Sequence, residues 1–326
     1  MGKRKTPINW KQYNKELVRR GKNLANSIKV LKNHDKKEEL KIMNKCKNGH
    51  PFEYTNRTII LFAIIKSITG MSYRLIGGFG ILLFSKMPCY TQICRRINKL
   101  PDELLEQLNR KITKNITKNK DTIDLIMDGT GIMVNSTYVW IDEKFNQKRK
   151  RDWKKLHIVM DRKTKAILFA EIMDKHKNEA ENNNMKDTLL NTIDNIADDV
   201  SVKKIYGDGL YDTNNNFEMC NKMGVELITR IRKPTIHTAE KMTDSKTNIA
   251  KFKRQRFRNN LRNRIAIEQI HWKEYVEKKG YGKRSGVEGV IGAFKRMFKE
   301  HACCKKDAFI KKEFLIKQIT WNLMRV

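Results

Sequence analysis

The stretch YGKRSGVEGVIGAFKRMF, residues 281–298, does most to decide the fold of this chain. Its apolar residues recur at the spacing of an α-helix, which turns about 100° per residue. The apolar face comprises Val287, Val290, Ile291, Phe294 and Phe298. Beside that face, four chemically active side chains share one narrow stripe: Tyr281, Arg284, Glu288 and Lys295. Because a helix that needed only solubility would scatter its charges, the stretch predicts a helix from about Gly282 that covers a sheet and holds an active stripe at its edge.

Three glycines interrupt the same helix, namely Gly286, Gly289 and Gly292. Each costs up to about 1 kcal/mol of helix stability relative to alanine. We expect another stretch of backbone to approach the helix closely where they lie.

Upstream, short apolar runs bounded by turn residues predict a mixed sheet. The predicted strands cover residues 122–128, 156–160, 166–172, 202–206 and 225–231, and residues 131–140 are expected to run antiparallel to 122–128. Helices are predicted over 179–196 and 214–223. The order β-β-β-α-β-α-β, followed by a basic insert and the helix above, predicts an α/β fold with a five-stranded mixed sheet and flanking helices.

Two predicted strands each end in an aspartate that a glycine follows. These aspartates are Asp128 and Asp208. If the two strands are neighbours, the two carboxylates form a site for a hard divalent cation, which prefers oxygen ligands. The alternative is that each aspartate only begins a turn, which is a common role for this residue.

The part of the chain before the sheet is predicted to be helical. Residues 1–50 resemble a basic, weakly helical arm, and helices are expected over 56–69, 73–84, 90–100 and 101–118. The third of these carries Gln92, Arg95, Arg96 and Lys99 away from its apolar residues. A short helix, a turn and a helix with outward basic and amide side chains suit a unit that reads a DNA groove. An ordinary helical subdomain with solvated arginines is the alternative.

The chain is strongly basic, with 69 Lys and Arg against 36 Asp and Glu and a formal charge of +33. Such a charge favours a polyanionic partner, above all nucleic acid, because phosphate contacts release bound counterions. A lysine-rich composition inherited from an AT-rich genome is the alternative. Clustering supports binding, because residues 1–50 hold 15 basic and 4 acidic residues and residues 251–264 hold seven basic residues and no acid.

Several classes of protein are disfavoured by what the sequence contains. The longest apolar run, Ile59 to Ile65, is far shorter than the about 20 residues of a membrane span. No apolar segment follows the basic N-terminus as in a secretory signal. Six irregularly spaced cysteines do not suggest a disulfide framework, so a cytoplasmic location is expected. No phosphate-binding loop of the GxxxxGK[ST] type occurs, so no nucleotide cofactor is expected.

The active stripe and the two aspartates together resemble a known family. Tyr281-x2-Arg284-x3-Glu288-x6-Lys295, downstream of Asp128 and Asp208, is similar to the D-D-E signature and Y-R-E-K motif of the IS4/IS5-type insertion-sequence transposases. Residues 207–213 (GDGLYDT) resemble the family's second aspartate box, residues 153–157 its strand before a β-hairpin, residues 87–96 its N-terminal helical region and residues 313–324 its closing helix. The resemblance covers about residues 52–326.

The resemblance implies an RNase H-like fold over residues 119–326, with a modest basic insert at about 232–278, preceded by a helix-turn-helix-like DNA-binding region over 51–118. It implies a transposase that cleaves transposon ends and transfers the 3′-hydroxyl strand to target DNA. Asp128, Asp208 and Glu288 are then the catalytic residues and the ligands of two Mg²⁺ or Mn²⁺ ions. A homodimer is implied on DNA, in a cytoplasmic, nucleoid-associated protein.

DNA contacts follow from the same resemblance and from the basic clusters. Tyr281, Arg284 and Lys295 are expected to contact the strand near the transposon end. Gln92, Arg95 and Arg96 are expected to read the end sequence, and the basic run of the insert to follow the phosphate backbone. In that run the candidate residues are Lys251, Lys253, Arg254, Arg256 and Arg258.

Two other functions remain open from the sequence. One is a sequence-specific DNA-binding protein without catalysis, which intact Asp128, Asp208 and Glu288 disfavour. The other is an RNase H-like nuclease or resolvase, which would cleave DNA but not join it. An assay for metal-dependent nicking addresses the first alternative, and an assay for strand transfer addresses the second.

Overall fold

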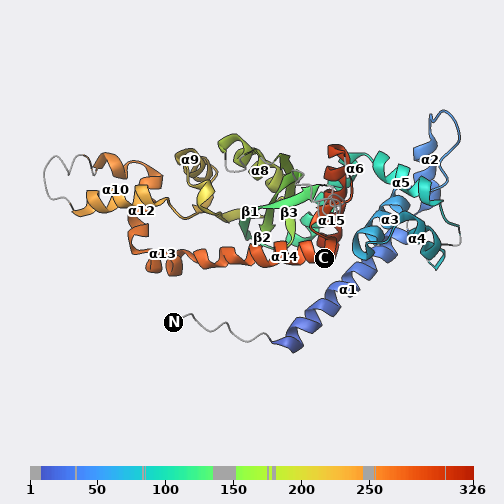
Figure 1. Cartoon of the computed structure of the whole chain (residues 1–326), viewed down its shortest axis with the longest axis horizontal. Helices are drawn as coiled ribbons and strands as arrows, with labels where there is room; N and C mark the ends of the chain where they lie inside the picture. The colour runs from blue at the N-terminus through green and yellow to red at the C-terminus, as the bar shows by residue number, and fades with distance from the viewer. Residues whose placement is uncertain are drawn as a thin grey trace, which may run out of the picture. The chain divides into compact units, whose positions relative to one another are not determined.

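The computed structural model describes residues 9–33, 35–82, 84, 86–134, 152–174, 176–177, 181–244, 253, 255–304 and 306–326. The chain divides into two compact units (Figure 1). The first, here called the helical unit, comprises Met1–Ile112 and Lys306–Val326. The second, here called the sheet unit, comprises Thr113–Lys305.

The described part of the helical unit is built of helices, as predicted. Its elements are α1 (Trp10–Lys32), α2 (Lys36–Asn44), α3 (Asn56–Thr69), α4 (Tyr73–Phe79), the 3-10 turn η1 (Gly80–Leu82), α5 (Tyr90–Lys99), most of α6 (Asp102–Thr117) and α15 (Asp307–Leu323). The arm expected to be weakly helical therefore contains a 23-residue helix, α1.

Local capping explains where α3 and α4 begin. The Thr55 hydroxyl accepts a hydrogen bond from the Thr58 backbone N–H at 3.1 Å, and the Ser72 hydroxyl accepts one from Leu75 N–H at 3.3 Å. Gly70 ends α3 in the left-handed conformation, with φ of 67°. The predicted bounds of α3 are confirmed, whereas α4 is shorter than the predicted 73–84.

The last helix, α15, belongs to the helical unit. Its side chains are buried on several faces, and even Lys312 is buried, where its ammonium donates to the carbonyl oxygens of Asn98 at 2.9 Å and Leu100 at 2.6 Å. The predicted catalytic domain, 119–326, includes α15, whereas the compact sheet unit ends at Lys305. Because α15 bonds to residues 212 and 214 positions earlier, local sequence does not show which compact unit it joins.

The sheet unit contains a mixed sheet in the order β3-β2-β1-β4-β5. The strands are β1 (Thr122–Val134), β2 (Asp152–Asp161), β3 (Ile167–Asp174), β4 (Ser201–Tyr206) and β5 (Glu226–Ile228). β2 runs antiparallel to β1 and β3, whereas β4 is parallel to β1 and to β5. This order and these directions confirm the RNase H-like sheet. A sixth, two-residue strand, β6 (His301–Ala302), pairs in parallel with the end of β1 and was not predicted.

The first strand corrects one prediction. β1 does not stop at Asp128 but runs on to Val134, so the described residues of the segment 131–140 continue β1 and do not form its antiparallel neighbour. That neighbour is β2, which pairs with β1 from Leu125 to Val134. Continuous pairing with β2 keeps the chain extended at Asp128-Gly129, although these two residues locally favour a turn. Residues 135–140 lie outside the described residues.

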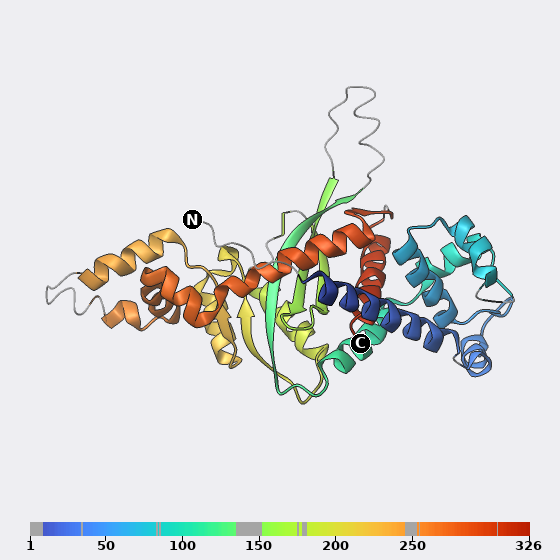
Figure 2. The same ribbon diagram turned by 90° about the horizontal axis from the view of Figure 1, so that it is seen from below.

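Helices flank the sheet on both faces. α8 (Asn182–Asp194) packs against β3 and α9 (Asn214–Lys222) against β5, whereas α14 (Gly286–Phe298) packs against β1. Figures 1 and 2 show α14 on the opposite side of the sheet from α8 and α9. Of the predicted apolar face of α14, Val287, Val290, Phe294 and Phe298 are buried and Ile291 is half-buried.

The insert between β5 and α14 is helical in its described part, as predicted. It contains α10 (Lys233–Asp244), α12 (Leu261–Glu268), the 3-10 turn η3 (Gln269–His271) and α13 (Trp272–Lys279). A second 3-10 turn, η4 (Tyr281–Ser285), leads directly into α14.

The glycines of α14 correct another prediction. A Cβ at Gly289 would meet no atom within 4 Å, and at Gly292 it would approach only the guanidinium of Arg296. At Gly286 it would meet the ammonium of Lys165, the flexible end of a side chain. In the described part of the chain, no second backbone approaches this helix at its glycines.

Within the described residues, no single helix has both the length and the hydropathy of a membrane span. Taken together, α3 and Tyr73–Leu82 are long and apolar enough for a span, but the pair is bent by 111°. Ile59 to Ile65 of this pair are buried in the helical unit.

Candidate active site

Strand register brings the two predicted aspartates together. β1 and β4 are parallel neighbours, and Ile126 pairs with Tyr206. Asp128 and Asp208 each follow that pair by two residues. Asp128 is still within β1, and Asp208 lies in extended backbone just beyond β4, so the register places the two aspartates at neighbouring positions on the same end of the sheet. The expected adjacency of the two strands is confirmed, although Asp128 lies within its strand and not at the end.

The loop after β4 fixes the position of Asp208. Its carboxylate accepts a hydrogen bond from the Leu210 backbone N–H at 2.9 Å, and its carbonyl oxygen accepts one from the Thr229 hydroxyl. A Cβ on Gly207 would meet the ring of Tyr211 at 2.7 Å, so the turn needs a glycine there. Tyr211 is buried, and its hydroxyl lies 2.8 Å from Nε2 of the buried His157 on β2.

The end of α13 is anchored to the sheet near these aspartates. The Tyr206 hydroxyl donates to the Lys279 carbonyl oxygen at 3.3 Å, and the Lys279 ammonium lies 2.6 Å from the Glu226 carboxylate. Gly280, at φ of 71°, then turns the chain into η4. The active stripe is thus carried by a 3-10 turn followed by an α-helix, which corrects the predicted continuous α-helix from Gly282.

Arg284 joins the stripe to the sheet. Its Nη1 lies 3.3 Å from Oδ2 of Asp128, and its Nη2 lies 3.5 Å from Oε1 of Glu288. The Asp128 side chain is 18% exposed and that of Arg284 is 22% exposed, whereas Glu288 is 66% exposed. The arginine therefore bridges a largely buried carboxylate and an open one.

The electrostatics of Asp128 link the three acidic side chains. Burial raises the pKa of the Asp128 carboxyl above its ordinary value. The hydrogen bond from the Gly129 N–H and the charge of Arg284 oppose that shift, and the negative charges of Asp208 and Glu288 add to it. Asp208 and Glu288 therefore each lie close enough to Asp128 for their charges to act on it, although Asp208 is 80 residues and Glu288 is 160 residues farther along the chain.

The donor set suits a hard divalent cation, because it consists of carboxylate oxygens around a position of excess negative charge. The spacing is wider than in a preformed metal cage: among the described residues, no group of three or more His, Cys, Asp or Glu side chains is arranged to hold a metal ion. Arg284 supplies positive charge between two of these carboxylates. The chemistry of the site thus fits a cation, and the side chains have to close around it.

Aromatic residues border the site next to Asp208. Tyr281 packs edge-on against Trp272, with ring centroids 5.2 Å apart, and the guanidinium of Arg230 lies 5.1 Å from the Trp272 ring centre. Burial raises the pKa of the Tyr281 hydroxyl, while the charge of Arg284 lowers it and that of Asp208 raises it. Tyr281 and Arg284 therefore both lie beside the two aspartates.

Lys295 lies on α14 seven residues beyond Glu288 and is half-buried. Within the described part of the chain its side chain makes no ion pair or hydrogen bond, so its ammonium is available to an external anion.

Sequence reasoning missed a second charged cluster close to the site. Arg262 on α12 holds the buried Asp212 through two contacts, at 2.6 and 2.7 Å, and the Arg232 N–H donates to the same carboxylate at 2.9 Å. The buried Gln269 extends this framework, because its side-chain amide bonds to the Thr229 carbonyl at 2.8 Å and to the Ile231 N–H at 2.9 Å. For the pair of Arg262 and Asp212, the only sequence signal was that Asp212 lies inside the GDGLYDT box.

One predicted DNA contact is wrong. Arg96 is buried, and its guanidinium donates to the Tyr54 carbonyl at 3.0 Å and to the Asn56 side chain at 2.8 Å. It also lies 4.4 Å from the centre of the Phe52 ring. Arg96 therefore holds the start of α3 to α5. Arg95 is exposed and Gln92 is half-buried, so both side chains are accessible at the surface of α5.

The basic insert has a groove that the sequence did not predict. Lys253, Arg256 and Arg258 are exposed, whereas Lys251 and Arg254 lie outside the described residues. A groove of about 510 Å³ lies between α9 and α12. It is lined by three cations, three amides, one acid and one apolar residue: Lys222, Arg256, Arg264, Asn221, Asn259, Asn260, Glu218 and Leu261.

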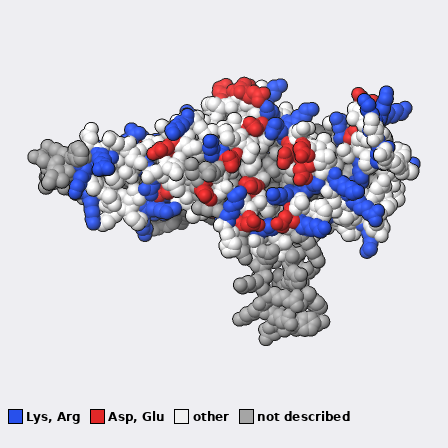
Figure 3. All heavy atoms as spheres, turned by 90° about the horizontal axis from the view of Figure 1, so that it is seen from above, with Lys and Arg blue, Asp and Glu red and all other residues white. Residues whose placement is uncertain are grey.

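The surface charges of the sheet unit are unevenly distributed. On the face shown in Figure 3, Asp and Glu gather over the sheet and α8, whereas Lys and Arg predominate toward α10 and α12. Because phosphates bind where positive charge predominates, the groove between α9 and α12 is a suitable surface for a nucleic-acid backbone.

Residues 119–323, well over half of the chain, match the family model of the transposase DDE domain. The match begins just before β1 and includes the two aspartates, the insert and α14.

Three solved structures are also similar to parts of the chain. A chain of the simian T-cell lymphotropic virus intasome in complex with PP2A regulatory subunit B56 gamma is 14% identical at a TM-score of 0.26, over 65% of this chain and 64% of that one. A chain of the Drosophila P element transposase strand transfer complex is 11% identical at 0.30, over 64% and 48%. A chain of the Mos1 mariner paired end complex with Mn is 10% identical at 0.24, over 72% and 81%. The chain thus spans less than two thirds of the first of these and about half of the second.

Proposed function

The chain belongs to the family of transposase DDE domains, and from that premise we propose that it cuts DNA at transposon ends and joins the freed 3′-hydroxyl to target DNA. The substrate is a phosphodiester in both steps. The nucleophile is water in the first step and the 3′-hydroxyl in the second. Because one phosphodiester replaces another during joining, the reaction requires no nucleoside triphosphate.

The observation that carries the proposal is that two acidic side chains from distant parts of the chain, Asp208 and Glu288, both add negative charge near Asp128. Asp128 lies on β1, Asp208 follows the parallel neighbour β4 by two residues, and Glu288 lies 3.5 Å from Arg284, which contacts Asp128. Their mutual repulsion adds to the raised pKa of Asp128. A structural role for these acids would favour full pairing with cations, which Asp212 has and which these three lack among the residues that the structure describes.

The family uses divalent metal ions, and we assign Asp128, Asp208 and Glu288 as the residues that hold two of them, Mg²⁺ or Mn²⁺. Bound between these carboxylates, the ions supply Lewis-acid activation of the nucleophile and of the leaving oxygen. The protein's part is to present the oxygen ligands from rigid elements, two from the sheet and one from α14.

The basic side chains of the stripe bind the phosphate groups around the cut. Arg284 exchanges a carboxylate partner for a phosphate oxygen, which suits its planar, bidentate geometry. Lys295, which has no ion-pair partner among the described residues, contacts a second phosphate. Tyr281, held against Trp272, orients the strand beside Asp208.

Other parts of the chain hold the DNA farther from the cut. The groove between α9 and α12 follows the backbone through Lys222, Arg256 and Arg264, joined by the exposed Lys253 and Arg258. Arg95 and Gln92 on α5 contact the transposon end. Bringing two ends together requires two copies of the chain, so the DNA-bound form is a homodimer.

The finer assignment is to the IS4/IS5-type transposases. It rests on the spacing Tyr281-x2-Arg284-x3-Glu288-x6-Lys295, and it gains support from the proximity of Tyr281, Arg284 and Glu288 to the two aspartates.

The proposal is tested with purified full-length chain and a supercoiled plasmid that carries the ends of its own element. Wild type should nick at the ends and join them to a second plasmid when Mg²⁺ or Mn²⁺ is added. Asp128→Asn, Asp208→Asn and Glu288→Gln should each lower both products by about a thousandfold or more, because each removes a charged ligand.

Glu300→Gln is the matched control, because Glu300 is an exposed acid just beyond α14 and its side chain forms no ion pair or hydrogen bond in the described part of the chain. It should retain wild-type activity. Retained nicking in any one of the three site variants would remove that residue from the site. Nicking without joining in wild type would instead identify a nuclease or resolvase, and binding without either product would identify a DNA-binding protein.

A further inference from the structure

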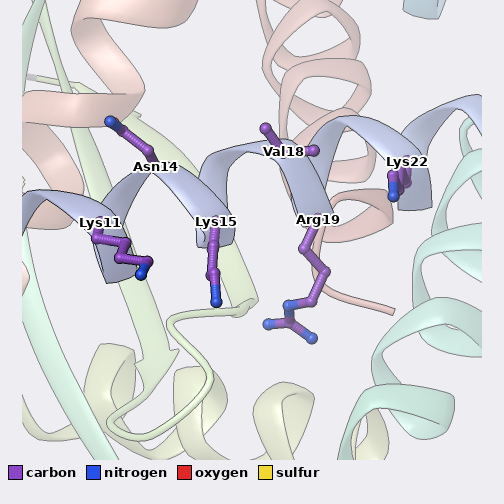
Figure 4. A pocket seen from close by; sticks show the side chains of 6 residues that line it. All are labelled: Lys11, Asn14, Lys15, Val18, Arg19 and Lys22. Atoms are coloured by element: carbon purple, nitrogen blue, oxygen red, sulfur yellow. The ribbon is translucent and has the colours of Figure 1, made fainter.

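The first helix carries a basic stripe that the proposed function leaves without a role. At about 100° per residue, five cations of α1 lie within about 80° of one another around the helix axis. They are Lys11, Lys15, Arg19, Lys22 and Lys29. Figure 4 shows the side chains of Lys11, Lys15 and Arg19 directed to the same side of the helix. Since helix residues rise by about 1.5 Å each, this stripe is about 27 Å long.

The stripe is largely free of neutralising partners. All five side chains are exposed. Arg19 forms an ion pair with Glu16 at 2.8 Å, whereas the four lysines have no ion pair or hydrogen bond within the part of the chain that the structure describes. Glu16 is the only acid of α1, and it lies outside the arc of the stripe. Four unpaired lysines on one face leave a concentrated positive surface that solubility does not require.

The opposite face of α1 argues against a membrane as the partner. Trp10, Tyr13 and Leu17 form an exposed apolar stripe whose centre lies about 150° from that of the basic stripe. The half-buried Leu24, Ile28 and Leu31 continue the apolar stripe along the helix. A helix on a membrane surface inserts its apolar face and keeps its cations on the opposite, polar face. Here α1 packs against α3 and α15, so the half-buried part of the apolar stripe is already covered within the helical unit. Of the stripe, Trp10, Tyr13 and Leu17 are what remains exposed to a bilayer.

A straight row of cations fits a linear polyanion. Duplex DNA carries one negative charge per about 1.7 Å of its axis, so the length of the stripe faces many phosphates. The row has few hydrogen-bonding amides that could read base edges, so its contacts are to phosphate. We propose that the basic stripe of α1 is a sequence-independent DNA-binding surface, separate from the carboxylate site and from the groove between α9 and α12.

The experiment compares two triple variants of the full-length chain. The test variant is Lys11→Gln, Lys15→Gln and Lys22→Gln. The matched control is Lys37→Gln, Lys41→Gln and Lys45→Gln, which removes the same charge from three exposed lysines on and next to α2 of the same unit. Glutamine keeps the helix propensity of lysine, so circular dichroism should be unchanged in both.

The measured quantity is the salt dependence of binding to a 30-base-pair duplex of random sequence in EDTA, so that neither cleavage nor end recognition contributes. Each lost phosphate contact lowers the slope by about 0.9. The test variant should therefore lose about 2 to 3 units of slope and bind at least about tenfold more weakly at 100 mM salt. The control should lose less than about one unit.

Equal losses of slope in the two variants would overturn the proposal, because α1 would then act only through net charge. An unchanged slope in the test variant, with loss of its binding to phosphatidylserine vesicles, would overturn it in favour of a membrane surface. Since the assay contains no metal, its result stands independently of whether Asp128, Asp208 and Glu288 catalyse any reaction.

Discussion

Two arginine–aspartate pairs in the sheet unit differ in how their charges are balanced. Arg262 and Asp212 form a closed pair, in which the carboxylate also accepts the Arg232 N–H and has no exposed surface. Arg284 contacts Asp128 and Glu288, and Asp208 adds a third negative charge nearby. One cluster is fully compensated and buried, whereas the other has more negative charge than its arginine can neutralise and opens to solvent.

The difference separates a structural pair from a site prepared for a ligand. A satisfied buried pair holds α12 against the loop that carries Asp208, and any change to it disturbs the framework. An uncompensated carboxylate cluster costs stability and persists where a cation or another ligand relieves the repulsion. Both clusters consist of arginine and acidic residues, so they are distinguished by their balance of positive and negative charge.

The largest expected effect tests the structural pair. Arg262→Met should lower the free energy of unfolding by about 3–5 kcal/mol, because it leaves the buried Asp212 carboxylate without its partner. Arg284→Met should lower it by about 1 kcal/mol or less, because Arg284 is partly exposed and its partners repel one another. Urea unfolding of the full-length chain measures both. Equal losses would mean that the two pairs do not differ in the way proposed.

A smaller effect concerns the pH dependence of the open cluster. The folded-state pKa of Asp128 is raised, chiefly by burial, so its charged form destabilises the folded chain. Below the ordinary aspartate pKa of about 4 the group is neutral in both states, and the cost is absent. As the pH rises through the folded pKa, wild type should lose stability relative to Asp128→Asn. Thermal unfolding in EDTA at pH 4 and pH 8 measures this; a difference in Tm that does not grow with pH would contradict it.

The smallest effect contrasts a free cation with a satisfied one. Lys295→Ala should reduce the salt slope of binding to transposon-end DNA by about one unit, through loss of one phosphate contact. Arg96→Ala should leave the slope nearly unchanged and lower stability, because Arg96 holds Tyr54 and Asn56. Filter binding at several salt concentrations, with urea unfolding alongside, distinguishes them. If Arg96→Ala lowered the salt slope and Lys295→Ala lowered stability instead, Arg96 would be the DNA contact and Lys295 the structural residue.

The sequence predicted best those features that neighbouring residues determine. Thr55, Ser72 and Gly70 cap or end their helices through contacts within four residues, so the bounds of α3 followed directly. The spacing of Tyr281, Arg284 and Glu288 placed these residues together for the same reason, even though the first turn of the helix is 3-10.

Features that depend on distant partners were missed or misread. Pairing with β2 carries β1 through Asp128-Gly129, and packing against Phe52 buries an arginine, Arg96, that looked like a surface residue. Arg262 and Gln269 appeared to be part of a basic, solvated insert, yet they bond to the loops after β4 and β5. Nothing local in the sequence distinguishes these residues from exposed ones.

The most direct test of the central claim is the binding of Mn²⁺ to the full-length chain, followed by electron paramagnetic resonance in the presence of uncleavable end DNA. Wild type and Glu300→Gln should approach two bound ions per chain, and Asp128→Asn, Asp208→Asn and Glu288→Gln should each lose at least one. If the three site variants bind as many ions as wild type, Asp128, Asp208 and Glu288 do not hold the metal, and the proposed catalytic site is wrong.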